Sequence, residues 1–278
     1  MSKRLERAAA IVWFRDEACR DVAVAGGKGA SLAAMTAAAL PVPPGFVVAA
    51  DVLAASTDSG RLRELAVAQR YDEAKELVSR AQPPAPEIAD AYEKLGGGRV
   101  AVRSSAVAED SEAASFAGQQ ETYLNVEGAD DVAARVVDCW ASFFSERALF
   151  YRGHKGSLAD LAMAVVVQKM VDPEKSGVLF TADPVQRRRD QMIVEAVYGL
   201  GEQVVSGEVT PDHYVVDRAG AVKRAIEPNG GVLSAQELVR LAELGLRLED
   251  FFGGPQDIEF AIAGGEVFLL HSRPVTTL

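Results

Sequence analysis

The sequence predicts a mixed fold of helices and strands, α+β or α/β, arranged in two lobes. Helical patterns dominate up to about residue 95, whereas β-rich segments separated by glycine loops dominate from residue 99 onward. The chain is expected to end in an antiparallel hairpin, because two β-rich segments flank Gly264 and Gly265. A soft boundary near residues 168–173 divides the expected lobes into residues 1–170 and 171–278.

The helices are predicted from apolar periodicity and from the turns that interrupt it. Residues 30–40 carry apolar side chains at helical spacing and end at the turn Pro41-Val-Pro-Pro-Gly45. Later helical patterns are polar and are broken by proline or glycine clusters. The expected helices are residues 30–40, 53–80, a segment that ends at 95, and 131–151, the last with a large aromatic face.

The strands are predicted as short β-branched runs bounded by glycine or turn residues. The longest of them, residues 164–170, reads Ala-Val-Val-Val-Gln-Lys-Met. The expected strands are residues 45–50, 100–103, 164–170, 177–181, 192–196, 214–216, 257–262 and 267–273.

Composition excludes several classes of protein. The 278 residues are 49% hydrophobic and 25% charged, which is typical of a globular chain long enough to bury a core. With 29 Lys and Arg against 40 Asp and Glu, the net charge is −11, so the basic excess of a nucleic-acid or anionic-membrane binder is missing. No apolar run approaches the ~20 residues that cross a bilayer. Cys19 and Cys139 form no metal-binding pattern, and we expect buried thiols in a reducing cytoplasm.

The segment Gly26-Gly-Lys-Gly-Ala-Ser31 is the first candidate phosphate site. Its glycines expose backbone N–H groups, the helix that follows adds partial positive charge, and Lys28 adds a full charge. The segment is neither a P-loop nor a dinucleotide fingerprint, because residues that those motifs require are replaced here. On this motif alone, a glycine turn with a solvated lysine is an equal alternative.

The second candidate is the strand Val100-Ala-Val-Arg103 with the segment that follows it. An arginine at the end of a strand can bind a polyphosphate with its bidentate fork. Residues 106–120 are mostly small, so they could close over a ligand with their backbone amides. Taken alone, an ordinary surface loop is the simpler interpretation.

The third candidate is the hairpin at residues 257–273. Asp257 and Glu259 share one face of a strand, and so do His271 and Arg273. A three-residue turn at 264–266 would place Glu259 opposite His271 and Asp257 opposite Arg273, whereas a two-residue turn would put the pairs on opposite faces. If they converge, carboxylates suit a metal and the guanidinium suits phosphate oxygens, as Mg²⁺-bound triphosphate requires. The alternative is a cross-strand salt bridge on an exposed face.

Together, the motifs occur in an order that resembles one family. They are Gly26-Gly-Lys-Gly29, Val102-Arg-Ser-Ser105 with Ser115-Phe-Ala-Gly-Gln-Gln120, Ser176-Gly-Val-Leu-Phe-Thr-Ala-Asp-Pro184, Gly199-Leu-Gly-Glu202 with Val205-Ser-Gly207, Asp257-Ile-Glu259, and Ser272-Arg-Pro274. From about residue 20 to 275, the chain resembles the ATP-grasp nucleotide-binding domain shared by phosphoenolpyruvate synthase, pyruvate phosphate dikinase and rifampin phosphotransferase. The resemblance implies an α+β, two-lobed ATP-grasp domain with mixed, largely antiparallel sheets that binds ATP and Mg²⁺.

The resemblance also implies roles for residues at the matching positions. Three basic residues match the family's phosphate-binding and catalytic cations: Lys28, Arg103 and Arg273. Gly118 and Thr122 match its phosphate loop, which here spans residues 104–122. Gln168 matches the hinge on the adenine side of the nucleotide.

On the metal side, Glu259 matches the family's carboxylate, and Asp257 and His271 complete the expected ligand set. The family usually has glutamine where this chain has His271. An imidazole nitrogen can bind a metal much as a carboxamide oxygen does, but it is shorter and gains a proton in mild acid. If His271 lies at the metal, Mg·ATP affinity is expected to fall in mild acid.

The function that the resemblance implies is that of an incomplete phosphotransferase of the dikinase class. The chain would bind Mg·ATP and pass phosphoryl groups to a carrier histidine, yielding AMP. No swivelling domain with a Gly-Gly-x-x-Ser-His setting occurs in these 278 residues. We therefore expect that histidine on another chain or on a removed domain, with a small-molecule acceptor held by that partner.

Several points stay open at this level. The acceptor is unassigned between pyruvate, an antibiotic and other small molecules, and the chain is either a natural split subunit or an excised domain. The alternative function is a nucleotide-binding regulatory module or pseudo-enzyme without turnover. We expect a cytoplasmic protein with no nucleic-acid or membrane partner.

Overall fold

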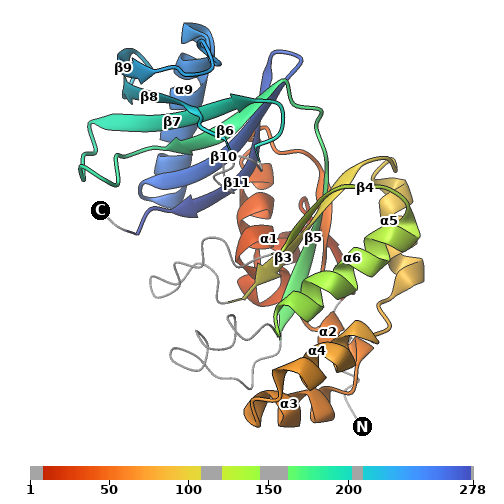
Figure 1. The fold of residues 1–278 in the computed structure, drawn as a ribbon. Coiled ribbons are helices and arrows are strands. Elements are labelled where there is room, and N and C mark those ends of the chain that lie inside the picture. The colour runs from red at the N-terminus through yellow and green to blue at the C-terminus, as the bar shows by residue number, and fades with distance from the viewer. Residues whose placement is uncertain (1–8, 108–120, 145–161, 202–208, 277–278) are drawn as a thin grey trace. The chain divides into compact units, whose positions relative to one another are not determined.

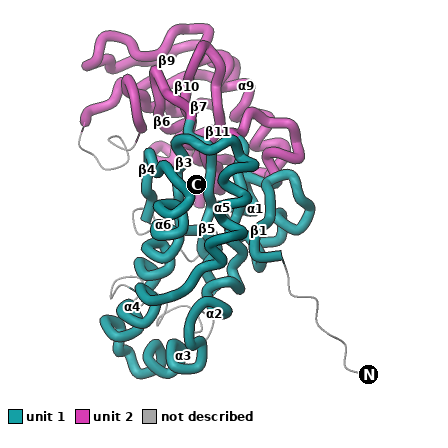
Figure 2. The backbone as a smooth tube through the Cα atoms, turned by 90° about the vertical axis from the view of Figure 1, so that its right-hand side faces the viewer, with its two compact units in different colours: residues 1–33, 44–170 teal, residues 34–43, 171–278 magenta. Residues whose placement is uncertain are grey.

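The computed structural model describes residues 9–107, 121–144, 162–201 and 209–276. Contacts divide the chain into two compact units, which Figure 2 distinguishes by colour. The first unit comprises residues 1–33 and 44–170, and the second comprises residues 34–43 and 171–278. Each unit holds one sheet, and neighbouring strands in both sheets are antiparallel in the described part of the chain. The predicted α+β class with largely antiparallel sheets is confirmed.

The first unit is built on a five-stranded sheet with the order β1-β2-β5-β3-β4 (Figure 1). Two neighbouring strands of this sheet, residues 100–106 and 163–169, are almost entirely buried. The strands are β1 (Ile11–Trp13), β2 (Gly45–Val48), β3 (Val100–Ala106), β4 (Thr122–Val126) and β5 (Met163–Lys169).

The helices of this unit lie in the predicted regions but are more numerous, and residues 145–151 of the last predicted helix lie outside the described residues. The polar helix expected over 53–80 is three helices, because Asp58 caps a new helix and Gln69 adopts a left-handed φ of 57°. The helices are η1 (Glu17–Arg20), α1 (Val22–Ala37), α2 (Val52–Ser56), α3 (Ser59–Val67), α4 (Tyr71–Ser79), α5 (Ala85–Lys94) and α6 (Ala129–Ser142).

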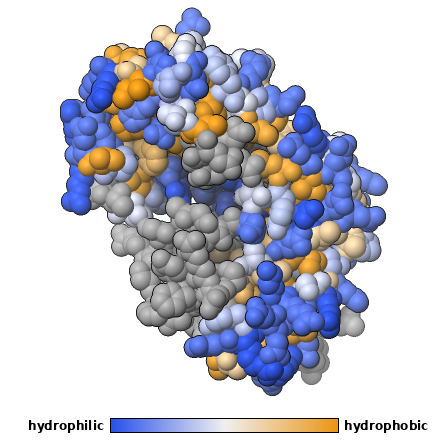
Figure 3. Space-filling model, viewed as in Figure 1, coloured by the Kyte–Doolittle hydropathy of each residue, from blue (hydrophilic) through white to orange (hydrophobic). Residues whose placement is uncertain are grey.

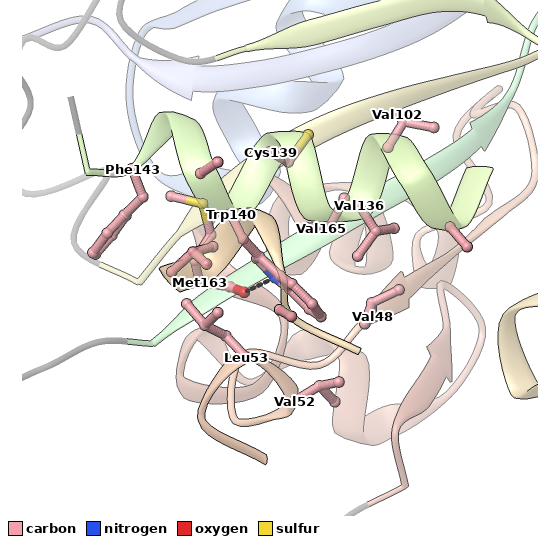
Figure 4. Close-up of a cluster of buried hydrophobic side chains, with 14 of the residues drawn as sticks. Val48, Val52, Leu53, Val102, Val136, Cys139, Trp140, Phe143, Met163 and Val165 are labelled. Atoms are coloured by element: carbon pink, nitrogen blue, oxygen red, sulfur yellow. Dashed lines mark hydrogen bonds between the residues drawn. The ribbon is translucent and has the colours of Figure 1, made fainter. Parts of the chain in front are cut away.

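The main core of the first unit lies between one face of the sheet and helices α2 to α6. Trp140 of α6 is fully buried in it, and its indole Nε1 donates a hydrogen bond to the carbonyl oxygen of Met163, 3.1 Å away (Figure 4). Val102, Val165 and other alternate residues of β3 and β5 point into this core. The intervening residues of the same strands therefore point to the opposite face.

The second unit is built on a six-stranded sheet with the order β11-β10-β6-β7-β8-β9. Residues 34–43 belong to it by contact, for example through the hydrogen bond from the Leu269 N–H to the carbonyl oxygen of Pro41 (2.8 Å). The strands are β6 (Lys175–Phe180), β7 (Gln191–Tyr198), β8 (Asp212–Asp217), β9 (Val222–Ile226), β10 (Gln256–Ala263) and β11 (Glu266–Pro274).

One face of this second sheet is covered by α9 (Ala235–Phe252). The helix begins with a capping box formed by Ser234 and Glu237 and ends at Gly253, whose φ is 78°. A Cβ on Gly245 would lie 3.1 Å from Leu179 Cδ2, so helix and sheet pack closely there. Leu179 and the residues that share its face are thus covered by α9, and the alternate residues occupy the other face.

On the side seen in Figure 3, hydrophilic residues predominate and hydrophobic ones occur in small groups. Within the described part of the chain, no helix combines the length and the apolar character that a membrane span requires.

Candidate functional site

Three predicted site residues of the first unit share one face of its sheet. Arg103 in β3 pairs directly with Thr122 in β4 and with Val166 in β5. Gln168 lies two residues beyond Val166 in β5, so its side chain emerges on the same face. This face is opposite to the one that carries the main core.

The polar residues on this face are buried. The exposed fraction is 8% for Arg103 and 3% for Gln168. Arginine is almost never buried to this extent unless its charge is compensated. The sheet thus holds a guanidinium and a carboxamide that are largely shielded from water.

Lys28 is carried by α1, the helix that packs against this same face. A Cβ on Gly29 would lie 3.1 Å from Val47 Cγ2 and 3.6 Å from Val166 Cγ2. Lys28 itself is only 4% exposed, and its Nζ donates a hydrogen bond to the carbonyl oxygen of Ser104 at 3.1 Å. The structure therefore brings Lys28 to the strand that carries Arg103.

The glycine-rich segment is fixed to β3 by Ser105. The Ser105 hydroxyl donates to the carbonyl oxygen of Ala25 (2.8 Å) and accepts from the Gly29 N–H (3.1 Å). Gly26 has a φ of 67°, and a Cβ there would lie 2.2 Å from the Ser105 carbonyl oxygen. Glycine is thus required for the chain to approach β3 so closely.

The predicted start of this helix was wrong. Gly26 has non-helical angles (φ 67°, ψ 174°) and separates a short helical segment that begins at Val22 from the helix that carries Lys28, which therefore begins directly after Gly26 rather than at Ala30. Gly26 thus forms the break before this helix, as a glycine turn would, whereas Gly27 and Gly29 lie within the helix. Gly118 and most of the predicted phosphate loop, residues 108–120, lie outside the described residues.

In the second unit, the hairpin forms the two predicted cross-strand pairs, but its turn is shorter than the three-residue turn that was expected to produce them. Ala263 pairs with Glu266, so the turn has two residues, Gly264 and Gly265, both with positive φ. For a turn of this length we expected the pairs to separate. Instead, the register shifts between Glu259 and Phe260, and this bulge places Glu259 opposite His271.

Beyond the bulge, Asp257 lies opposite Arg273 and forms an ion pair with it. Arg273 Nε donates to Asp257 Oδ2 at 2.8 Å, and Arg273 Nη2 lies 2.7 Å from the same oxygen. Burial raises the pKa of the Asp257 carboxyl, and the charge of Arg273 opposes that rise. The Arg273 side chain is 41% exposed, so this pair presents an oriented cation at the protein surface.

His271 and Glu259 form a looser pair on the same face. Nδ1 of His271 lies 3.6 Å from Glu259 Oε1, which exceeds a hydrogen-bond distance. The His271 side chain is 8% exposed, and its Nε2 has no hydrogen-bond partner among the residues that the structure describes.

A second carboxylate–imidazole pair on this face was missed in the sequence. Glu195 in β7 lies opposite His213 in β8, with Nδ1 3.2 Å from Oε1. Glu195 also pairs with Val178, which in turn pairs with Glu259, so both acidic residues share the face that α9 does not cover. Alternation within each strand was visible in the sequence, but the partner strand and the register were not.

The fit of these residues to Mg²⁺ is partial. Within the described ranges, no three His, Cys, Asp or Glu side chains come together to hold a metal ion. Asp257 is engaged by Arg273, which leaves Glu259 as the carboxylate best suited to a cation. Mg²⁺ in nucleotide enzymes is often held by one or two carboxylates together with substrate phosphates, so Glu259 fits such a role.

Both cysteines are buried, as predicted. Burial raises the pKa of Cys19 to about 12 and also raises the pKa of Cys139. Thiols that stay protonated at neutral pH are poor nucleophiles and poor metal ligands. Neither cysteine therefore belongs to the candidate chemistry.

The chain matches the family described as pyruvate phosphate dikinase, AMP/ATP-binding domain, over residues 22–230 and 220–278. It is 43% identical to a probable phosphoenolpyruvate synthase from Archaeoglobus fulgidus, over 96% of this chain and 42% of that protein. It is 36% identical to phosphoenolpyruvate synthase from Pyrococcus furiosus, over 96% and 44%, and 36% identical to an uncharacterized phosphotransferase from Bacillus subtilis, over 92% and 34%.

The chain thus spans less than half the length of these curated relatives. The family match itself covers nearly all of the chain, including the glycine-rich segment, β3 and the terminal hairpin. The chain belongs to the family of pyruvate phosphate dikinase AMP/ATP-binding domains.

Proposed function

We propose that this chain is the ATP-binding component of a dikinase-type phosphotransferase and acts on Mg·ATP. The observation that carries the proposal is the burial of Lys28 and Arg103 at one face of a sheet, beside Gln168. Cations at a buried site bind polyphosphate oxygens with short, charge-assisted hydrogen bonds, and these bonds are stronger away from water. Family membership in an AMP/ATP-binding domain supports ATP as that polyphosphate.

In the second unit, Arg273 is proposed as a phosphate ligand and Glu259 as a metal ligand. Asp257 restrains the guanidinium of Arg273, so less side-chain entropy is lost when Arg273 binds a phosphate. Glu259 would hold Mg²⁺, with His271 and Asp257 beside it. When bound, Mg²⁺ neutralises charge on the phosphates.

In the proposed reaction, no residue of this chain forms a covalent bond to the nucleotide. A nitrogen of the carrier histidine attacks the β-phosphorus of ATP, and the bond from that phosphorus to the oxygen of the α-phosphate breaks. AMP leaves with that oxygen, and the histidine carries a pyrophosphoryl group. Lys28, Arg103 and Arg273 would stabilise the charge that shifts among the phosphate oxygens.

The carrier histidine is proposed to lie on a swivelling domain outside these 278 residues, on another chain or in a longer protein. That partner would also hold the small-molecule acceptor. The proposal is supported by the relatives named phosphoenolpyruvate synthase, which are more than twice as long as the part that this chain matches.

The experiment combines this chain with the histidine-carrying remainder of the Pyrococcus furiosus phosphoenolpyruvate synthase and α-labelled ATP. We expect labelled AMP only when both proteins are present. Arg103→Ala is expected to abolish AMP formation while circular dichroism stays close to that of the wild type, and Arg103→Lys should retain part of the activity because it keeps the charge.

Two results would contradict the proposal. Undiminished AMP formation by Arg103→Ala would show that the reaction does not need Arg103. Tight Mg·ATP binding without AMP formation at any carrier concentration would favour the alternative function, a nucleotide-binding regulatory module.

A further inference from the structure

A buried polar network lies on the face of the second sheet that α9 covers, behind the hairpin. It links side chains from different elements: Arg218 after β8, Glu249 on α9, Thr181 after β6, Gln256 on β10 and Ser272 on β11. Thr181, Gln256 and Ser272 are each no more than 2% exposed. Polar groups buried this deeply stabilise a structure only when their hydrogen bonds are satisfied.

The first part of the network ties the end of β6 to α9. The Thr181 hydroxyl donates to Glu249 Oε1 at 2.5 Å. Arg218 donates to the same carboxylate oxygen at 3.2 Å and to the carbonyl oxygen of Thr181 at 2.5 Å. Glu249 is therefore held from two sides, and it fixes the Thr181 hydroxyl in turn.

The second part ties Thr181 to the hairpin. The Thr181 hydroxyl accepts from the Gln256 N–H at 2.8 Å, and the Thr181 N–H donates to the Gln256 carbonyl oxygen at 2.9 Å. The Gln256 carboxamide oxygen accepts from the Ser272 hydroxyl at 2.9 Å. The network thus clamps the first residue of β10 and a residue near the end of β11.

The clamped residues are direct neighbours of the ion pair on the opposite face. Asp257 follows Gln256, and Arg273 follows Ser272. Successive side chains of a strand point to opposite faces, so Gln256 and Ser272 hold the backbone from which Asp257 and Arg273 project.

We propose that Thr181 and Gln256 are positioning residues for Arg273. Through the backbone of β10 and β11, they hold Asp257 and Arg273 in the geometry in which the guanidinium meets its ligand. This inference rests on the proposed function to the extent that the ligand of Arg273 is a phosphate of Mg·ATP.

The test compares Thr181→Val with Thr181→Ser. Valine keeps the shape but removes the hydroxyl, which leaves the Gln256 N–H without its side-chain acceptor and removes one of the donors to Glu249, while Arg218 still donates to that carboxylate. Serine keeps the hydroxyl. The two readouts are the dissociation constant of Mg·ATP and the hydrogen exchange of the Arg273 Nε–H, followed by nitrogen-15 NMR and assigned with Arg273→Lys.

We expect Thr181→Val to weaken Mg·ATP binding roughly tenfold, about the net contribution of one hydrogen bond, and to accelerate exchange of the Arg273 Nε–H. Thr181→Ser should stay within about twofold of the wild type in both readouts. Ser234→Ala is the matched control, because it weakens the N-cap of α9 without touching the network. It should lower the melting temperature but leave both readouts unchanged.

Two outcomes overturn the inference: unchanged exchange of the Arg273 Nε–H in Thr181→Val, or equal losses in Thr181→Val and Ser234→Ala. Failure of the wild type to bind Mg·ATP would instead contradict the proposed function. The exchange of the Arg273 Nε–H would still decide whether Thr181 positions Arg273.

Discussion

Glu259 lies directly opposite His271 across the terminal hairpin, with the imidazole Nδ1 3.6 Å from the carboxylate Oε1. The two-residue turn alone would pair Glu259 with Leu270. A bulge between Glu259 and Phe260 shifts the register by one residue and brings His271 to the face that carries Glu259. An imidazole and a carboxylate thus meet where the family relationship leads us to expect a metal ligand set.

This spacing predicts an unusual metal preference. A separation of 3.6 Å exceeds a hydrogen bond, and the imidazole and the carboxylate would both be able to hold the same cation. Because imidazole suits Mn²⁺ better than Mg²⁺, we expect the wild type to favour Mn²⁺·ATP more strongly than His271→Gln does. Titrating the wild type and His271→Gln with Mg²⁺·ATP and with Mn²⁺·ATP gives, for each protein, the ratio of its two affinities. Equal ratios in the two proteins would show that His271 does not bind the metal.

A second prediction concerns Gly26. Alanine at this position would have to adopt a φ of 67° and would place its Cβ 2.2 Å from the Ser105 carbonyl oxygen. We expect Gly26→Ala to lower the free energy of unfolding by about 3 kcal/mol, measured by urea denaturation. Gly29→Ala is the comparison, because its Cβ would lie 3.0 Å from Ala25 Cβ and needs only a small shift. A loss as large in Gly29→Ala would argue against the close approach of Gly26 to β3.

A third prediction concerns the buried carboxylate of Asp212, which organises the loop before α9. Although burial raises the pKa of Asp212, hydrogen bonds from the N–H groups of Asn229, Val232 and Gly231 outweigh that effect and hold it below its usual value. A folded-state pKa below the unfolded one stabilises the protein above the unfolded pKa, and the contribution is lost as the pH falls through the folded pKa.

Asp212→Asn removes this titration and replaces one acceptor oxygen by a donor. We expect it to lower the free energy of unfolding at pH 7 by about 1–3 kcal/mol. The difference from the wild type should shrink as the pH falls from about 5 towards 3. Urea denaturation at several pH values measures both effects, and a difference that does not depend on pH would contradict the assignment.

The sequence was sufficient for the parts of the fold and site that depend on local patterns. Strand alternation placed Asp257 with Glu259 and His271 with Arg273, and glycine spacing marked the segment around Lys28. Features set by distant residues could not be predicted. The Ser105 hydroxyl joins Gly29 across 76 positions and holds the helix that begins directly after Gly26 close to β3.

The hairpin is a second feature that local sequence patterns do not determine. Turn length alone predicted that Glu259 and His271 would lie on opposite faces if the turn had two residues. The bulge is fixed instead by packing, since Leu269 is fully buried while His271 pairs with Glu259 on the other face. The pair of Glu195 and His213 depends on which strands are neighbours, and spacing within one strand carries no information on that.

The most direct test of the central claim is calorimetric titration of this chain with Mg·ATP beside the variant Lys28→Ala. Lys169→Ala is the matched control, because that lysine lies in the same unit and its Nζ donates to the carbonyl oxygen of Gly96 at 3.3 Å. We predict saturable binding by the wild type, a loss of at least roughly tenfold in Lys28→Ala, and little change in Lys169→Ala. Absence of binding by the wild type, or equal affinities in the wild type and Lys28→Ala, would contradict the nucleotide site.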